Sequence, residues 1–477
     1  MSDKFLLAVD CGSQSTKVSL IDTKGEVICS ASEKLSPMIN RHKGWVEHPG
    51  DDIWDSLKVA LKKLFQKFQG DKDDILGMGL CSIRCCRVFL DENKELAEPI
   101  MSWMDVRAYE TYEDDEKFRW TGSTSGYLNY KLTGVLKDTI ANAFQYQFPT
   151  DMINWKWLPE GKDFDKYNIP REKLIDMDLP SKILGHVTEE VAKETGLPAG
   201  LPVVSTANDK AVEGLGCGLV KEGLGLLSLG TYITSMTVGK EYSEATDNMF
   251  PNLSCMPGKY LFESNGNRGG MWHISWFVNL LGETFRAFAN SNDKIPEQLL
   301  EVEAKDVAAG SDGLLVVLDW LAPHTELHRK GVMIGFDQRH TRAHVYRAIM
   351  EAIAMTMKNN FFAMTEELNF TPDKLVVSGG GSNSALFMQI IADVFGINTV
   401  RNKMNGSAGL GAAICASVAT GYYKTFEEAV ENMVHEKDVF EFNPDNHATY
   451  SKINDEAYKK LSEMLEPTLK TIAKACN

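Results

Sequence analysis

The sequence has no uninterrupted apolar stretch of bilayer length, and its start, MSDKFLLAVD, places charge before a short apolar run without a small-residue cleavage site. We therefore expect neither a membrane-spanning helix nor a secretory leader. The nine cysteines are scattered without a C-x-x-C pair, which disfavours a disulfide framework and a zinc site. Together these absences predict a cytoplasmic protein.

The densest group of cysteines is Cys81, Cys85 and Cys86. On a predicted strand, Cys85 and Cys86 would point to opposite faces, which argues against a shared metal ion. We interpret these thiols as small buried hydrophobic side chains.

Basic residues are also in deficit. Lysine and arginine number 50 against 66 aspartates and glutamates, a formal net charge of −16. This excess of negative charge disfavours nucleic acids and anionic membrane surfaces as partners. Hydrophobic residues make up 43% and charged residues 24% of the 477 residues, so we expect an ordinary globular chain of two or more domains.

Two nucleotide-binding signatures are missing. No G-x-x-x-x-G-K-[ST] motif occurs, and the glycine-rich stretches at 214–219 and 409–414 lack the third small residue of the dinucleotide fingerprint. The sequence therefore disfavours a P-loop and a Rossmann domain.

Strand and helix patterns alternate along the chain, which predicts an α/β fold. The opening pattern of strand, glycine turn and strand returns after residue 223, so we expect two related lobes with a boundary near 220–226, closing over a shared cleft. The predicted elements are three strands within 5–28, a helix at 51–68 behind Asp51 and Asp52 as caps, strands at 75–83 and 87–93, a strand pair at 223–239, a long helix at 340–368, and a strand, turn and helix at 374–396.

Three glycine turns could let backbone N–H groups approach phosphate oxygens. They are Gly12-Ser13-Gln14-Ser15-Thr16, Gly230-Thr231 and Gly379-Gly380-Gly381-Ser382-Asn383, the last running into a helix N-terminus. For any one of them alone a tight turn is the better interpretation, because glycine marks turns in most α/β folds.

Two carboxylates follow apolar runs. Asp10 closes the first predicted strand, and Asp209 follows LPVVSTA. A carboxylate at a strand end beside a glycine turn can hold Mg²⁺ or accept a proton from a substrate hydroxyl. The alternative is that each caps a helix or a turn.

These residues resemble the FGGY family of carbohydrate kinases (xylulokinase, gluconokinase and glycerol kinase types), in the actin, sugar kinase and Hsp70 superfamily. The resemblance spans nearly the whole chain. It is carried by DCGSQSTK (10–17), GWVEH (44–48), WMDVR (103–107), GLPAGLPVVSTANDKAVEGLGCGL (196–219), Gly230-Thr231, the glycine run at 379–381, and GVMIGFDQRHTRAHVYRAIME (331–351).

The resemblance implies two actin-like, ribonuclease H-like ATPase domains, 1–222 and 223–477, around an interdomain cleft. It implies ATP-dependent phosphorylation of a sugar, with Asp209 as the catalytic base and Asp10 holding Mg²⁺ through water. Homodimers are common in such families. The sugar-binding residues implied or inferred are Arg84, Trp103, Asp105, Asp209 and Lys210, and those for ATP are Gly12, Ser13, Gln14, Lys17, Gly230, Thr231, Gly270, Gly380, Gly381 and Asn383.

Departures from the family pattern leave alternatives open. The chain is shorter between Arg107 and Gly126 and lacks the usual K-x-x-W-L segment, while Lys210 replaces a glutamine and Tyr232 a serine. A sugar-sensing pseudokinase or a non-kinase ATPase is therefore the second hypothesis. Pentuloses, hexuloses, polyols and aldonates all remain candidate acceptors.

Three of the candidate site residues also have interpretations without a functional role. Arg84 could be a surface cation beside Asp91, Trp103 could be part of the core, and Lys210 could face solvent instead of tuning the substrate.

Overall fold

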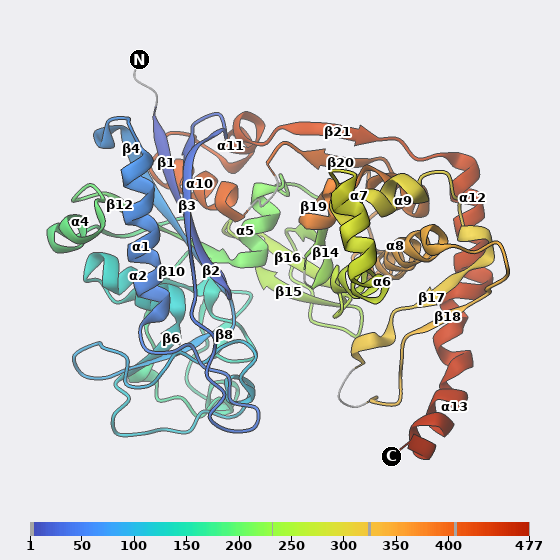
Figure 1. The fold of residues 1–477 in the computed structure, drawn as a ribbon. Helices are drawn as coiled ribbons and strands as arrows, with labels where there is room; N and C mark the ends of the chain where they lie inside the picture. The colour runs from blue at the N-terminus through green and yellow to red at the C-terminus, as the bar shows by residue number, and fades with distance from the viewer. Residues whose placement is uncertain (1–3, 231, 323–325, 405–407, 477) are drawn as a thin grey trace.

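The computed structural model describes residues 4–230, 232–322, 326–404 and 408–476. Two mixed sheets, each covered by helices, lie side by side, with the N-terminal sheet at the left of Figure 1 and the C-terminal sheet at the right. The predicted two-domain α/β fold is confirmed. The two sheets divide the chain between residues 208 and 224, and the exact domain boundary stays a prediction.

The N-terminal sheet places Asp10 at one edge. Strand β1 is almost wholly buried, pairs antiparallel with β2 so that Asp10 faces Lys17, and pairs in parallel with β4. The three predicted opening strands are thereby confirmed. The sheet has the order β11-β12-β4-β1-β2-β3, with bounds β1 (Phe5–Cys11), β2 (Ser15–Asp22), β3 (Val27–Lys34), β4 (Ile75–Ser82), β11 (Ile183–His186) and β12 (Pro202–Asn208).

Helix α1 (Asp52–Lys67) confirms the predicted amphipathic helix, and Asp51 stands at its N-cap position. The Asp51 carboxylate makes no capping hydrogen bond, however, and accepts one of 2.9 Å from the Tyr127 hydroxyl, while Asp52 binds Ser36. The other elements of this half are β5 (Arg87–Leu90), β6 (Trp120–Ser123), α2 (Thr124–Thr133), β7 (Lys137–Thr139), β8 (Thr150–Asp151), β9 (Lys156–Trp157), α3 (Lys162–Asp165), β10 (Asp176–Asp178) and α4 (Glu189–Thr195).

Cys81 lies within β4, near its end. Cys85 and Cys86 lie in the turn between β4 and β5, and Cys85 has a φ of 61°. The expected strand at Cys85 and Cys86 is therefore wrong. The three thiols are buried, as expected. Among the described residues no cluster of three or more His, Cys, Asp or Glu side chains is suited to a metal ion.

The C-terminal sheet repeats the opening pattern of the first. Strands β13 and β14 form the predicted antiparallel pair, and β13 runs parallel to β19 with Ser228 opposite Ser378. The sheet order is β15-β16-β14-β13-β19-β20-β21, with bounds β13 (Leu224–Leu229), β14 (Ile233–Gly239), β15 (Met249–Leu253), β16 (Tyr260–Ser264), β19 (Lys374–Ser378), β20 (Thr399–Asn402) and β21 (Glu436–Phe440).

Helices surround this second sheet (Figure 1). The predicted long helix is α8 (Arg342–Glu367), whose first two-thirds are buried, and α9 (Ala385–Phe395) follows the glycine turn after β19 as predicted. The remaining elements are α6 (Trp272–Ser291), α7 (Pro296–Ala304), β17 (Leu315–Val317), β18 (Val332–Ile334), α11 (Phe426–Met433), α12 (Pro444–Ile453) and α13 (Lys459–Cys476).

Two helices, α5 (Asp209–Gly216) and α10 (Ala408–Ala419), cross between the sheets. Helix α10 comes from the C-terminal half but packs on α5, β1 and β4 of the N-terminal half. The packing is close because glycines stand at the contacts. A Cβ on Gly79 would lie 2.0 Å from the Ala412 carbonyl oxygen, and one on Gly411 would lie 2.0 Å from the Val212 carbonyl oxygen. Gly411 of the 409–414 stretch thus serves helix packing.

Gly411→Ala should lower the free energy of unfolding by about 1–3 kcal/mol or more, because its methyl group would overlap the backbone of α5. Gly409→Ala in the same helix is the matched control. Its Cβ would meet only Ala8, at 4.0 Å, so alanine should be neutral or stabilising by up to about 1 kcal/mol. Urea unfolding of both variants checks this. Equal effects of the two substitutions would contradict the packing role.

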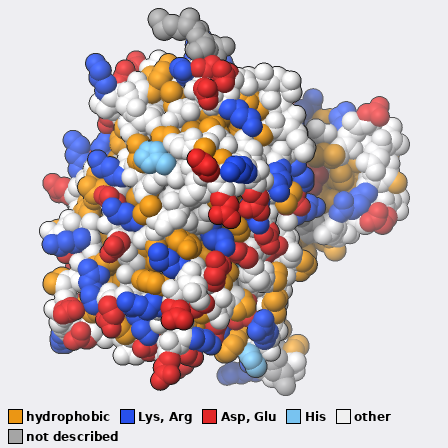
Figure 2. Space-filling model, turned by 90° about the vertical axis from the view of Figure 1, so that its left-hand side faces the viewer, with side chains coloured by type: hydrophobic (Ala, Val, Ile, Leu, Met, Phe, Trp, Pro, Cys, Tyr) orange, Lys and Arg blue, Asp and Glu red, His pale blue; other side chains and the backbone are white. Residues whose placement is uncertain are grey.

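No helix among the described residues combines the length and apolarity that a bilayer crossing requires. Figure 2 shows acidic and basic side chains interspersed across the face of the molecule on the side of the N-terminal sheet. Hydrophobic side chains are scattered between them on that face.

Candidate active site

Asp10 and Asp209 come together at one edge of the N-terminal sheet. Asp10 lies near the carboxyl end of β1, and Asp209 directly follows β12, which is parallel to β4 as β4 is to β1. Burial and the nearby Asp209 raise the pKa of Asp10 to about 6, with Lys17 opposing them. Burial also raises the pKa of Asp209, although Arg84 and Lys210 oppose it. Burial is the largest cause of both shifts, and neighbouring carboxylates add to it.

Asp209 does not cap its helix. The N-cap of α5 is Asn208, whose side-chain oxygen accepts hydrogen bonds of 3.1 Å from the backbone N–H groups of Lys210 and Ala211. The alternative interpretation of Asp209 as a helix cap is therefore wrong. Its side chain remains 34% exposed at the first position of the helix. The neighbouring asparagine thus satisfies the helix end and leaves the carboxylate for other partners.

Arg84 joins the two halves of the molecule. Its guanidinium group makes a two-pronged ion pair with Glu263 of β16, one contact of which is Nη2 to Oε2 at 3.2 Å. Arg84 Nε also lies 3.8 Å from Asp209 Oδ1. These two acids outweigh burial and raise the pKa of Arg84. The alternative placement of Arg84 beside Asp91 is wrong.

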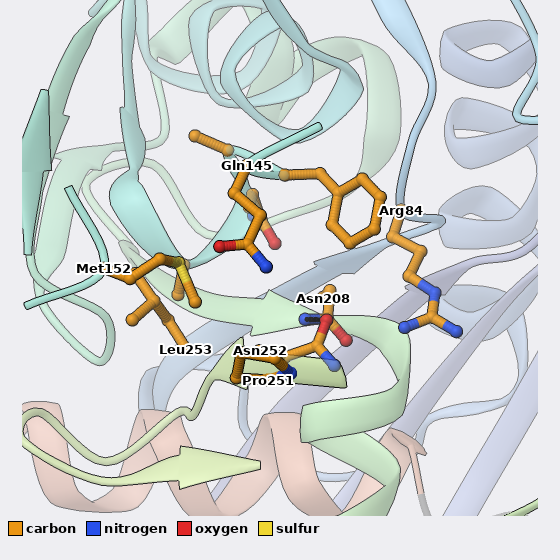
Figure 3. Close-up of a pocket in the computed structure, with 11 residues that line it drawn as sticks. Arg84, Gln145, Met152, Asn208, Pro251, Asn252 and Leu253 are labelled. Carbon is orange, nitrogen blue, oxygen red and sulfur yellow. Dashed lines mark hydrogen bonds between the residues drawn. The ribbon is translucent and has the colours of Figure 1, made fainter. Parts of the chain in front are cut away.

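Glu263 is the acid at this site that the sequence patterns did not reveal. Its side chain is fully buried, and Asn252 Nδ2 donates a hydrogen bond of 2.9 Å to Oε1. Asn208 Nδ2 in turn donates to Asn252 Oδ1 at 3.4 Å. Figure 3 shows Arg84, Asn208 and Asn252 around one cavity. The signal available in the sequence was a glutamate within the apolar-rich stretch YLFES, which the structure buries completely. A glutamate buried in this way is rarely without a partner.

Lys210 is turned toward the C-terminal sheet. Its Nζ contacts Glu213 Oε2 at 2.8 Å and donates to Ser228 Oγ at 3.2 Å, while Ser378 Oγ donates to Glu213 Oε1 at 2.6 Å. Burial opposes ionisation of Glu213, but Lys210 and the hydroxyl groups lower its pKa overall. The alternative of a solvent-facing Lys210 is wrong, because only 20% of its side chain is exposed.

The predicted phosphate loops face the same region from both sides. In the N-terminal half, Gly12 N–H closes a turn onto Ser15 at 3.1 Å, with Gln14 and Lys17 exposed. In the C-terminal half, Gly230 follows β13, and Gly379 follows the neighbouring parallel strand β19. Thr231 lies outside the described residues.

Four further predicted ATP residues lie in loops of the C-terminal half. Gly270 is buried at the start of α6, and its N–H is held by Asn267 Oδ1 at 2.9 Å. A Cβ on Gly380 would meet nothing within 4 Å, so this backbone is open to a ligand. Gly381 packs on Leu229, and Asn383 is exposed with its carbonyl bound to Arg401.

Hydrogen bonds and ion pairs hold the expected sugar loop, residues 103–107, in place. Asp105 is fully buried and accepts hydrogen bonds from Val46 N at 2.8 Å and from Arg107, which also binds Glu47. Trp103 is 44% exposed, so its alternative as a core residue is wrong. Asp105 therefore organises the loop, and Trp103 presents its ring to solvent.

A divalent cation fits the acidic charge at this site. Asp10 and Asp209 supply hard carboxylate oxygens, and the raised pKa of Asp10 shows negative charge that a cation would relieve. Because no larger acidic cluster is present among the described residues, such an ion would take its other oxygens from phosphates and water, as Mg²⁺ usually does.

Comparisons with known proteins agree with this arrangement. The profile of the FGGY family of carbohydrate kinases, N-terminal domain, matches residues 5–119 and 111–216, and the profile of its C-terminal domain matches 225–420. The chain is 43% identical over 471 residues to the protein named uncharacterized sugar kinase YgcE of Escherichia coli, covering 98% of this chain and 96% of that protein.

More distant relatives match over the full length. A xylulose kinase of Staphylococcus epidermidis is 25% identical over 510 residues, covering 99% of this chain and 100% of its own. The solved structure of gluconate kinase from Lactobacillus acidophilus superposes with a TM-score of 0.84 at 20% identity, covering 99% of this chain and 100% of the other.

Proposed function

The chain belongs to the FGGY family of carbohydrate kinases, and we propose that it transfers the γ-phosphoryl group of ATP to a hydroxyl group of a sugar or sugar derivative, with Asp209 as general base. The observation that carries this assignment is the position of Asp209. The N-cap of α5 is Asn208 and not Asp209, whose carboxylate accepts a hydrogen bond of 3.0 Å from the neighbouring Lys210 N–H, adjoins Asp10 in a region of raised carboxyl pKa, and lies beside Arg84.

Asp209 would accept the proton of the attacking hydroxyl group. Arg84 would orient that hydroxyl, because two of its five N–H donors are taken by Glu263 and the remainder are available. Trp103 offers an exposed ring against which the C–H face of a sugar can pack. Asp105 would act indirectly by holding the loop that carries Trp103.

Phosphoryl transfer requires positioning and charge neutralisation more than covalent chemistry. Lys17 and the backbone N–H groups around Ser13 and Gly230 would hold the phosphates, and Gly380, Gly381 and Asn383 would adjoin the adenosine. Asp10 would hold Mg²⁺, which neutralises charge on the phosphates when bound. Closure of the two domains would exclude water, the competing acceptor.

The acceptor class we propose is a pentulose such as xylulose or ribulose, or a related polyol or aldonate. Relatives named for xylulose, glycerol and gluconate support this range. Nine scattered cysteines without a C-x-x-C pair fit a reducing compartment, so we place the reaction in the cytoplasm.

Coupled detection of ADP release, with and without a panel of these acceptors and Mg²⁺, tests the proposal. Acceptor-dependent release is expected. Release that is independent of every acceptor would instead favour the ATPase hypothesis, which the departures at Lys210 and Tyr232 motivate. Binding of sugar without any release would favour a sensing pseudokinase.

Gly230→Val should raise the KM for ATP by about 10- to 100-fold while changing the KM for sugar little, because the side chain blocks backbone N–H groups from a charged phosphate. The variant should fold, since a Cβ at Gly230 would meet only the Tyr232 carbonyl oxygen at 3.6 Å.

Gly379→Ala is the contrasting variant. Gly379 has a φ of 87°, and its Cβ would lie 2.5 Å from the Leu229 carbonyl oxygen, so this change should reduce stability rather than ATP affinity alone. Steady-state kinetics and thermal unfolding separate the two. A folded Gly230→Val enzyme with equal rises in both KM values would mean that the loop is structural.

A further inference from the structure

A large groove lies beside the site and spans both halves of the chain. Its volume is about 760 Å³, within the range of small-molecule sites. The N-terminal half supplies Tyr109, Tyr146 and Tyr167, and the C-terminal half supplies Tyr242. None of these residues belongs to the catalytic or phosphate-binding set described above.

The groove connects to the acceptor region. Gln145 and Met152 line it, and they also line the cavity that Arg84 and Asn208 border (Figure 3). At its other side the Tyr109 hydroxyl donates a hydrogen bond of 3.0 Å to the Trp103 carbonyl oxygen. A molecule held at Arg84 and Trp103 could therefore extend into the groove.

The walls of the groove are aromatic and largely prearranged. Tyr146 is 51% and Tyr109 49% exposed, so their rings are available to a ligand. Tyr167 is held by a hydrogen bond of 2.6 Å to the Gln145 carbonyl oxygen, and Tyr242 packs on Tyr260 with ring centroids 5.5 Å apart. Fixed aromatic rings with amide and hydroxyl groups between them suit the C–H faces and hydroxyl groups of a sugar ring.

The charge of the groove is negative. Four acids line it against one base, Lys166. Such an excess disfavours ligands that carry carboxylate, phosphate or sulfate groups. The four acids are Glu110, Asp151, Asp163 and Glu244.

The chain that follows the sugar loop contributes to the groove through Glu110 and Thr111. Residues 110–119 form no helix or strand, and β6 begins only at Trp120.

We propose that this groove is a subsite for a second, neutral polyhydroxylated group of the acceptor, so that the preferred substrate is a glycosylated sugar or polyol. The inference rests on the proposed kinase function and names the acceptor class for the same site. The subsite binds the remote group and makes no bond to it. Its binding energy would improve kcat/KM by orienting the reacting hydroxyl group.

The test compares matched acceptors in the coupled assay of ADP release. Xylulose, glycerol and gluconate are each offered free, as a neutral hexosyl derivative and as a hexuronosyl derivative. At least one hexosyl derivative should show a kcat/KM about tenfold or more above its free counterpart, and the hexuronosyl derivative should be poorer. Free acceptors that equal or exceed every derivative would overturn the subsite while leaving the kinase function intact. No turnover with any acceptor would overturn both.

Tyr146→Ala should raise the KM for the hexosyl acceptor about tenfold and leave that for the free acceptor and for ATP unchanged. Tyr422→Ala is the matched control, because Tyr422 is also exposed, at 45%, and also makes one edge-to-face aromatic contact, with Tyr423. Thermal unfolding verifies that both variants fold. An unchanged KM for the hexosyl acceptor in folded Tyr146→Ala, or an equal rise for the free acceptor, would contradict the subsite.

Glu244→Lys tests the charge argument separately. Glu244 is exposed at the rim of the groove, so the change should be tolerated. The hexuronosyl acceptor should gain relative to the hexosyl acceptor. An unchanged ratio would show that the acids do not select the remote group.

Discussion

Asp209→Asn is expected to lower kcat for sugar phosphorylation by about two to four orders of magnitude, while ATP and sugar binding change no more than a few-fold. The amide has nearly the same volume as the carboxylate but cannot accept the proton of the attacking hydroxyl group. Rapid-quench or coupled assays give kcat, and calorimetric titration gives both affinities.

This variant should keep its fold. Burial raises the pKa of Asp209, so ionisation of the carboxyl group costs stability above its ordinary pKa, and a neutral amide removes that cost. Asn208, which caps α5, is untouched. Thermal unfolding should therefore show no loss of stability at neutral pH. Wild-type turnover in a folded variant would remove Asp209 from the mechanism.

Glu263→Gln is expected to lower kcat by about one to two orders of magnitude and to move the acidic limb of the pH–rate profile to lower pH. Arg84 is shared between Glu263, which it binds with two nitrogens, and Asp209, 3.8 Å from Nε. Without the Glu263 charge, Arg84 would pair directly with Asp209. That pairing lowers the pKa of Asp209 and makes its carboxylate less able to accept a proton.

Asn252→Ala is the control for this prediction. Asn252 donates to Glu263 at 2.9 Å, so the variant disturbs the same buried network but keeps the carboxylate charge. Its acidic limb should stay where the wild-type limb lies, and Glu263→Asp should restore part of the activity. An unmoved limb in Glu263→Gln would show that Glu263 does not govern the ionisation of Asp209.

Local patterns in the sequence predicted several of the elements around the site. Alternating and continuous apolar runs predicted β1, β2, β4, β13, β14 and β19, and helical spacing predicted α1, α8 and α9. Glycine turns after strands marked candidate loops because only a few residue types suit such backbone. The family resemblance then singled out Asp209 among 66 acidic residues.

Where two adjacent residues could play one role, the local pattern could not choose between them. Asn208 and Asp209 are both good helix caps, and Asp51 and Asp52 are both good caps for α1. The end of β12 sets Asn208 as the cap of α5, whereas Asp51 stands at the N-cap position of α1 with its carboxylate bound to the Tyr127 hydroxyl. These choices depend on neighbours supplied by other elements.

The sequence by itself predicted the two-domain α/β fold, the glycine turns and Asp209 as the candidate base, because each leaves a local or family-wide pattern. Tertiary structure alone decided the partners of Arg84 and Lys210 and the course of the groove. Arg84 meets Glu263 across 179 residues, and Glu213 meets Ser378 across 165. Pairing over such separations has no periodicity, since it depends on how two sheets pack across α5 and α10.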